Sequence, residues 1–158
     1  MAIKKATFAA GCFWGVEAKY QKVKGVLQTE VGYMGGRTES PTYRDVCTDR
    51  TGHAEVVQVT FDDSVVNYQE LLDIFWRCHD PTQKNRQGPD VGNQYRTAIF
   101  YHDEEQRKKA EASKSDLDGS QMFPRPIATV LEKAGTFWRA EEYHQKYFQK
   151  KGLDSCHI

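Results

Sequence analysis

The sequence predicts an α+β fold: a ferredoxin-like split βαβ sheet with helices packed on it and long functional loops. Its 158 residues suit one domain with a sizeable core, since a chain of this length buries roughly two-thirds of its unfolded surface. Strand and helix patterns follow one another in the order β-α-β-β-α-β. The sequence has no internal repeat, low-complexity stretch or linker, so we expect a single domain over residues 1–158.

The first part of the chain supplies the β-α-β-β half of this order. Residues 3–9 are predicted as a strand, 13–22 as a helix, 26–33 as a second strand and 53–61 as a third. The third strand is the clearest, because apolar residues alternate along HAEVVQVTF. This alternation assigns one face of the strand to the core.

The second part adds a helix and a strand, and then extends the pattern. Leu71, Leu72, Phe75 and Trp76 recur at helical spacing and predict a helix over residues 67–78. The remaining elements are predicted as a strand at 95–101, a polar surface helix at 104–117, a strand at 127–134, a short helix at 140–151 that Gly152 ends, and a mobile tail at 152–158. Two stretches, 34–52 and 79–93, are long and rich in turn residues, which is typical of functional loops.

The charge balance argues against nucleic-acid and membrane partners. There are 22 basic and 22 acidic residues, so a net charge of zero provides no field to attract phosphate. No apolar run approaches the roughly 20 residues of a membrane span. The N-terminal segment has two lysines but lacks the apolar region of a secretion signal, so we expect a cytoplasmic protein.

The chain has four cysteines, Cys12, Cys47, Cys78 and Cys156, which allow three pairings. A reducing compartment and a full-sized core make structural disulfides unnecessary, so any disulfide is expected to be transient and catalytic. Cys12 is the candidate nucleophile, and a small buried cysteine at a tight turn is the alternative. It follows a glycine at the predicted start of a helix, where unpaired N–H groups and the helix dipole favour a thiolate.

Two further patterns accompany this cysteine. Phe13 and Trp14 are adjacent, so they cannot both face the core, and at least one is expected to line a cleft. Glu55 falls on the apolar face of the third strand, where burial would raise its pKa and make it a general acid, although a solvated glutamate at a strand end fits the alternation equally well. Tyr43, Asp90 and Tyr95 are polar groups in the long loops that could project into the same cleft.

Five stretches spread over nearly the whole chain carry motifs of one enzyme family. They are GCFWGVE (11–17), VGYMGG (31–36), PTYRDVCTDRTGHAEVV (41–57), HDPTQKNRQGPDVGNQYRTAIFYH (79–102) and AEEYHQKY (140–147). In this order they strongly resemble the A-type peptide methionine sulfoxide reductases, which act on the S epimer of methionine sulfoxide. GCFWG is distinctive by itself.

The resemblance implies a role for each of these residues. The nucleophile falls on Cys12, the methyl-binding aromatics on Phe13 and Trp14, the acid on Glu55, and the oxygen-binding groups on Tyr43, Asp90 and Tyr95. The reaction it implies is attack on the sulfoxide sulfur, protonation of the oxygen, and release of methionine with a sulfenic acid left on the cysteine. The resemblance implies no metal and no cofactor.

A second thiol must then clear the sulfenic acid. In the family this cysteine is often in a mobile C-terminal tail, which makes Cys156 the matching candidate. Cys47, which we expect to be packed, and Cys78 are its rivals. The implied reductant is thioredoxin or a similar dithiol protein, and the substrate is methionine sulfoxide, either free or in proteins.

Two other classes of function are weighed beside this one. A cysteine hydrolase is suggested by Cys12 with a distant His144, but the residues before Trp14 differ from the papain pattern and the histidine falls on a predicted helix. A zinc-binding module could draw on Cys47, His53, Cys78, His79, Cys156 and His157, but no CxxC or spaced CxxH pair is present.

Overall fold

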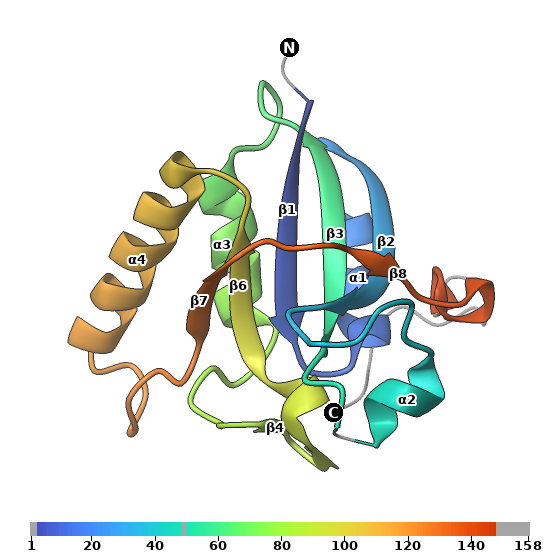
Figure 1. The fold of residues 1–158 in the computed structure, drawn as a ribbon. Helices are drawn as coiled ribbons and strands as arrows, with labels where there is room; N and C mark the ends of the chain where they lie inside the picture. The colour runs from blue at the N-terminus through green and yellow to red at the C-terminus, as the bar shows by residue number, and fades with distance from the viewer. Residues whose placement is uncertain (1–2, 49, 148–158) are drawn as a thin grey trace.

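A six-stranded sheet organises the molecule (Figure 1). The computed structural model describes residues 3–48 and 50–147. The four inner strands are β1 (Ile3–Ala10), β2 (Val26–Met34), β3 (Ala54–Asp62) and β6 (Thr97–Tyr101). They lie in the order β6-β1-β3-β2, and each is antiparallel to its neighbours. Together with the helices between them, they form the predicted split βαβ arrangement, which confirms the α+β class.

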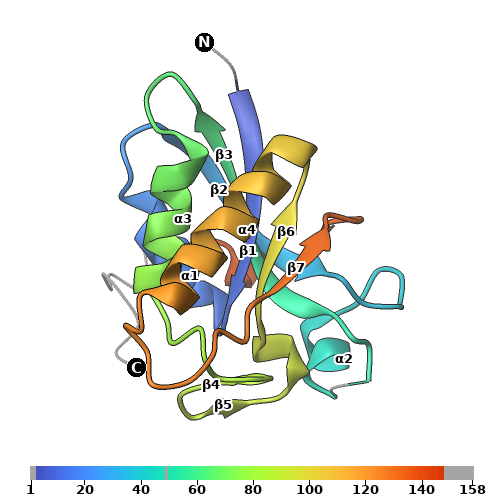
Figure 2. The same ribbon diagram turned by 90° about the vertical axis from the view of Figure 1, so that its left-hand side faces the viewer.

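Helices α1 (Phe13–Gln21) and α3 (Tyr68–Arg77) cover one face of the sheet, and their buried side chains form the main core with it (Figure 2). Helix α4 (Glu104–Gly119) packs beside α3 and the β6 edge. It is the predicted polar surface helix, and it buries Gln106 and Ala110. No helix among the described residues is long and apolar enough to span a membrane.

The opposite face of the sheet is crossed by residues 134–137, which we call the strap (Figure 1). The strap leads from β7 (Val130–Lys133), which pairs parallel with β6, to β8 (Trp138–Arg139), which pairs with β2. A Cβ at Gly32 would lie 2.4 Å from the Trp138 carbonyl oxygen, so β2 needs a glycine at this crossing. The strap helps to cover a second apolar cluster formed by Ala9, Met34, Ala54, Val56, Ala98 and Phe100.

Both long loops contain short elements that the sequence did not predict. They are α2 (Tyr43–Cys47) in the first loop, and β4 (Arg86–Gln87), β5 (Asp90–Val91) and the 3-10 helix η1 (Asn93–Tyr95) in the second. Helix α2 begins with a capping box, because the Thr42 hydroxyl accepts from the Asp45 N–H at 3.1 Å while the Asp45 carboxylate accepts from the Thr42 N–H at 3.1 Å. These elements give the loop residues backbone hydrogen bonds of their own.

The predicted helix over residues 140–151 is wrong for residues 140–146. Residues 142–144 form only a short 3-10 helix, η2 (Glu142–His144), and the chain then turns. The Gln145 side chain pairs with the backbone N–H and C=O of Val31, both at 2.8 Å, and Lys146 takes a φ of +52° that no α-helix allows. Residues 148–151 and the predicted tail at 152–158 lie outside the described residues.

Candidate active site

Cys12 stands where β1 ends and α1 begins, at the end of the sheet beside the second long loop. Gly11, just before it, has a φ of +94°, and a Cβ there would lie 2.8 Å from the Cβ of Gln87. Only glycine meets both constraints, so this residue allows the sharp turn that sets the cysteine at the helix N-cap. Cys12 is half-buried.

Glu55 reaches the same helix start from β3. Its side chain is 1% exposed, and its Oε1 accepts a hydrogen bond from the Phe13 backbone N–H at 3.2 Å. Its Oε2 is buried and has no hydrogen-bond partner in the described part of the chain. Burial raises the pKa of Glu55 to about 8, the Phe13 N–H opposes the rise, and the charge of Asp90 adds to it. The predicted desolvated carboxyl is therefore present, and it is largely protonated at neutral pH.

Phe13 and Trp14 take different places in the first turn of α1. The Phe13 ring is buried and lies 6.3 Å from the Tyr43 ring and 5.2 Å from the His144 ring, measured between centroids. Trp14 is half-buried and stacks on Tyr147 at 3.9 Å. One aromatic thus joins the core and the other stays at its edge, as the adjacency of the pair requires.

Tyr43 and Tyr95 bring their hydroxyl groups together from the two long loops. Their side chains are hydrogen-bonded to each other. Burial and the nearby charge of Glu55 raise the pKa of both, that of Tyr95 to about 12, so both keep their protons at neutral pH. Asp90, the first residue of β5, lies near enough for its charge to act on Glu55. The structure therefore gathers the four predicted polar residues around one point.

Glu141 and His144 also belong to this region. Glu141 was not predicted as a site residue, and His144 was considered only for the alternative cysteine hydrolase. The Glu141 carboxylate accepts from the Tyr33 hydroxyl and from the Tyr43 backbone N–H, both at 3.0 Å. The Nδ1 of His144 accepts from the indole N–H of Trp14 at 3.0 Å. Burial lowers the pKa of His144 against the opposing charge of Glu141, so its ring is neutral with the proton on Nε2. The AEEYHQKY motif, which contains both residues, was the available signal.

The other cysteines differ in how they relate to the site. Cys47 ends α2 and is exposed, so the expectation that it is packed was wrong: five residues of surface helix cannot bury it. Its thiol is hydrogen-bonded with the Tyr43 side chain. Cys78 caps the end of α3, and burial raises the pKa of its thiol to about 12. Cys156 lies outside the described residues.

The histidines do not support the two alternative functions. His53 is buried and binds the first long loop, accepting from the Gly36 N–H at 3.0 Å, while His79 is 2.7 Å from both the Phe75 carbonyl oxygen and the Thr97 hydroxyl. No three His, Cys, Asp or Glu side chains in residues 3–48 and 50–147 are grouped to hold a metal ion. His144 uses Nδ1 for the Trp14 indole, which takes that nitrogen away from any role as a base.

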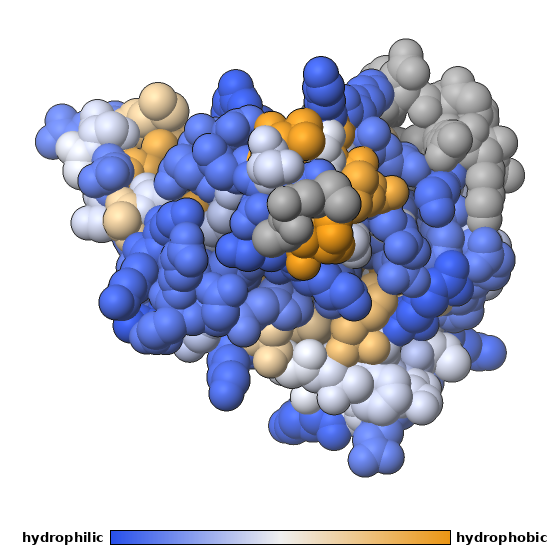
Figure 3. All heavy atoms as spheres, turned by 90° about the horizontal axis from the view of Figure 1, so that it is seen from above, coloured by the Kyte–Doolittle hydropathy of each residue, from blue (hydrophilic) through white to orange (hydrophobic). Residues whose placement is uncertain are grey.

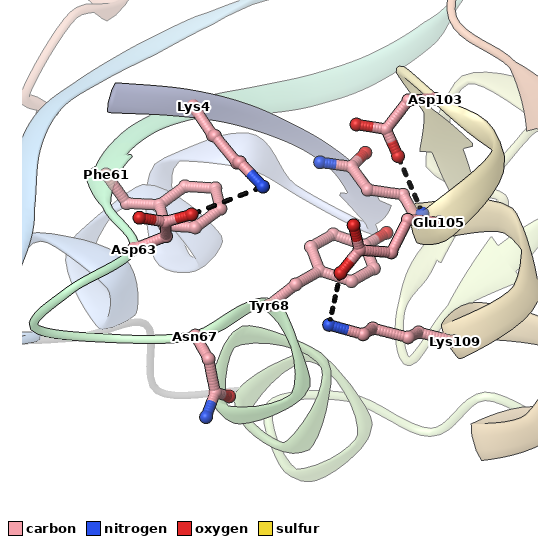
Figure 4. Close-up of a pocket in the computed structure, with 9 residues that line it drawn as sticks. Lys4, Phe61, Asp63, Asn67, Tyr68, Asp103, Glu105 and Lys109 are labelled. Atoms are coloured by element: carbon pink, nitrogen blue, oxygen red, sulfur yellow. Dashed lines mark hydrogen bonds and ion pairs between the residues drawn. The ribbon is translucent and has the colours of Figure 1, made fainter. Parts of the chain in front are cut away.

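A cavity of about 190 Å³ at the opposite end of the sheet offers no comparable chemistry (Figure 4). Two lysines in its wall are paired, Lys4 with Asp63 at 3.2 Å and Lys109 with Glu105 at 2.9 Å. Tyr68 also lines it, with a buried hydroxyl that has no partner among the described residues. It holds no cysteine or histidine, so the candidate active site is the one at Cys12.

The chain is similar to known proteins over nearly its whole length. The sequence model of one family, described as "Peptide methionine sulfoxide reductase", matches residues 4–158. A protein of Methanoculleus marisnigri named peptide methionine sulfoxide reductase MsrA is 61% identical over 98% of this chain and 94% of its own.

Two solved structures of Mxr1 from Saccharomyces cerevisiae also resemble the chain. The reduced form has a TM-score of 0.89 and 40% identity, covering 95% of this chain and 86% of its own. The Mxr1 structure in complex with Trx2 has a TM-score of 0.65 and 28% identity, covering 92% and 84%.

Proposed function

The chain belongs to the peptide methionine sulfoxide reductase family, and from that premise we propose how its own residues reduce methionine sulfoxide to methionine. The observation that carries the proposal is the buried Glu55 carboxyl, held against the first turn of the helix that begins at Cys12. A sulfoxide oxygen is a poor leaving group until it is protonated, so an acid beside a nucleophile suits this reaction.

Glu55 is the proton donor in this proposal. With a pKa of about 8, most of the carboxyl carries its proton at neutral pH, and Oε2 is free of protein partners in the described chain. A sulfoxide oxygen bound there would receive this proton, while the protonated hydroxyls of Tyr43 and Tyr95 stabilise the charge that develops on it. Asp90 supports the acid, because its charge disfavours ionised Glu55.

Cys12 is the nucleophile. The helix dipole at the start of α1 favours its thiolate. The thiolate bonds to the sulfoxide sulfur as the oxygen takes the proton. The bond between the substrate sulfur and its oxygen then breaks, and the oxygen becomes bonded to the cysteine sulfur as a sulfenic acid. Methionine leaves as a thioether. The methionine sulfur gains the two electrons that the cysteine loses.

Phe13 and Trp14 hold the S-methyl group of the substrate in this proposal, because their rings form the apolar part of the same helix start. A fixed apolar wall and a fixed acid accept only one arrangement of methyl and oxygen around the chiral sulfur. We therefore expect the enzyme to act on the S epimer, free or in proteins. Turnover of the separate S and R epimers with dithiothreitol tests this expectation.

Clearing the sulfenic acid needs a second thiol, which forms a disulfide with Cys12 and releases water. We propose Cys156 for this step, with thioredoxin or a similar dithiol protein reducing the disulfide in a cytoplasmic setting. Cys78 is a weaker rival, since a thiol with a pKa of about 12 is rarely a thiolate. Cys47 is the stronger rival for the resolving role, because it is exposed and its thiol is hydrogen-bonded with the Tyr43 side chain.

One experiment separates the first turnover from recycling. Cys12→Ser should release no methionine in a single turnover, and one full equivalent from this variant would remove the cysteine from the mechanism. Cys156→Ser should release one equivalent and accumulate sulfenic acid, detected by mass spectrometry after dimedone trapping, yet fail to turn over with thioredoxin. Sustained turnover by Cys156→Ser would transfer the resolving role to Cys47, to Cys78 or to direct attack by the reductant.

A further inference from the structure

A cavity of about 430 Å³ adjoins Cys12 on the side of α1 that faces the end of α3. Cys12, Gly15, Val16 and Lys19 contribute its α1 wall, and Arg77 lies on the opposite wall. Figure 2 shows α1 and α3 on the same face of the sheet. The cavity thus extends from the candidate nucleophile along about two turns of helix. None of the groups proposed above to bind the sulfoxide, other than Cys12 itself, lines it.

The cations in this wall have no carboxylate partners in the described part of the chain. Lys19 and Arg77 are both exposed, and neither makes an ion pair within residues 3–48 and 50–147. Arg77 donates from Nε to the Asp73 carbonyl oxygen at 3.2 Å, and this neutral acceptor does not cancel its charge. Two positive charges therefore face a cavity beside the nucleophile.

The other polar groups of the wall are already engaged. The carboxylate of Asp80 accepts from the Thr82 N–H at 3.0 Å and from its hydroxyl at 2.6 Å. The Gln87 amide bonds at 2.8 Å to both the N–H and the C=O of Asp80, and Gln83 accepts from the Gly88 N–H at 2.7 Å. His79 uses both ring nitrogens inside the protein. Lys19 and Arg77 are thus the cationic side chains left to contact a ligand, and they outnumber the single carboxylate of the wall, that of Asp80.

From this arrangement we infer that the cavity binds an acidic side chain of the oxidised protein, two or three residues from the methionine sulfoxide. The inference rests on the proposed function, since it places the sulfoxide at Cys12. Lys19 lies seven residues along α1, about 10 Å at 1.5 Å per residue. An extended peptide covers that distance in about three residues at roughly 3.3 Å each. The preferred substrate class is therefore protein methionine sulfoxide near Asp or Glu.

Three matched peptides test the inference on the full chain. Each carries one methionine sulfoxide, with Asp, Asn or Lys at the second and third positions on both sides, and kcat/KM is measured with dithiothreitol. An exposed ion pair contributes a modest free energy, so the wild type should prefer the Asp peptide to the Asn peptide by roughly 2- to 5-fold for each cation engaged. The preference should shrink as salt is added.

Charge reversal and a matched control decide the outcome. Lys19→Glu and, separately, Arg77→Glu should lower kcat/KM for the Asp peptide and raise it for the Lys peptide, leaving the Asn peptide within about twofold. Lys22→Glu makes the same charge change at an exposed residue that follows the end of α1 and does not line the cavity. It should leave the order of the three peptides by kcat/KM unchanged. The inference would be overturned if the wild type and both cavity variants showed the same ratio of kcat/KM between the Asp and Lys peptides. It would also be overturned if Lys22→Glu changed this ratio as much as the cavity variants do. Failure to reduce even the Asn peptide would instead count against the proposed function.

Discussion

The two ends of the sheet treat charged side chains in opposite ways. At the far end, where β1 begins and β3 ends, lysines and carboxylates form exposed ion pairs such as Lys4–Asp63 (Figure 4). Figure 3 shows that end as largely hydrophilic, and its exposed apolar side chains include Ile3 and Leu27. At the other end of the same two strands, Glu55 is buried, and no cation in residues 3–48 and 50–147 forms an ion pair with it. Carboxylates at the far end are thus paired and solvated, whereas the Glu55 carboxyl at the candidate active site is buried.

A second buried glutamate shows that burial alone does not leave a carboxylate unpartnered. Glu17, on α1, is also 1% exposed, yet its Oε2 accepts from the Thr29 hydroxyl at 2.8 Å and its Oε1 from the Lys146 N–H at 2.7 Å. Glu55 keeps one oxygen without a partner in the described chain. An unsatisfied buried polar atom lowers stability. We infer that this end of the sheet gives up stability to keep an oxygen ready for substrate.

The largest effect that would sharpen this comparison is expected from Glu55→Gln. The amide keeps the shape of the carboxyl but cannot deliver a proton, so the single-turnover rate should fall roughly 10²- to 10⁴-fold. Quenched-flow release of methionine measures this rate. Asp63→Asn, at the far end, is the matched control and should leave it unchanged. A wild-type rate in Glu55→Gln would mean that the proton comes from another group.

An intermediate effect is expected on how stability depends on pH. The pKa of Glu55 is about 8 in the folded chain and 4.5 ordinarily, so the folded state holds an extra proton between these values. Its contribution is complete below pH 4.5 and is lost as pH rises through 8, by roughly 1.4 kcal/mol per pH unit. In urea unfolding from pH 5 to 9, the free energy of unfolding of the wild type should therefore fall relative to that of Glu55→Gln as pH increases. A constant difference would contradict a buried protonated carboxyl.

The smallest effect is expected at the far end. Lys4→Gln removes one member of an exposed ion pair, and such pairs often contribute nothing measurable to stability. We expect no measurable change in Tm by calorimetry and an unchanged kcat/KM. A clear loss of activity in Lys4→Gln would contradict this expectation, because it would show that a residue at the far end affects the candidate active site.

The elements that form the centre of the sheet could be predicted from local pattern. Strand alternation around Val57 and helical spacing around Leu71 depend on burial against neighbours that any α+β core supplies. For Glu55 the face of its strand fitted a buried acid and a solvated glutamate equally well, and the resemblance to the family favoured the acid. Cys12 was predicted from its place after a glycine at a helix start. In each case the signal lies within a few residues of the group concerned.

The remaining parts depend on partners far away in the sequence. Gln145 belongs to a segment with a helical pattern, but its side chain pairs with Val31, 114 positions away, and that pairing prevents a helix. Glu141 and His144 gain their roles only by contact with Tyr43 and Trp14. No local pattern specifies such contacts. The surface position of Cys47 was missed because the five-residue α2 has too short a pattern to assign faces.

The strap also sets the order in which a newly made chain can complete its active site. It runs from β7 at one edge of the sheet to β8 at the other, so it can settle only on strands that have already paired. Glu141 and His144 follow the strap, and the bond from Trp14 to His144 closes a loop of 130 positions. Closing so long a loop costs conformational entropy, so we expect this contact to form after the strands have paired. During synthesis, the sheet can therefore assemble while Cys12 is still without its complete surroundings, and reactivity arrives only with the last part of the chain.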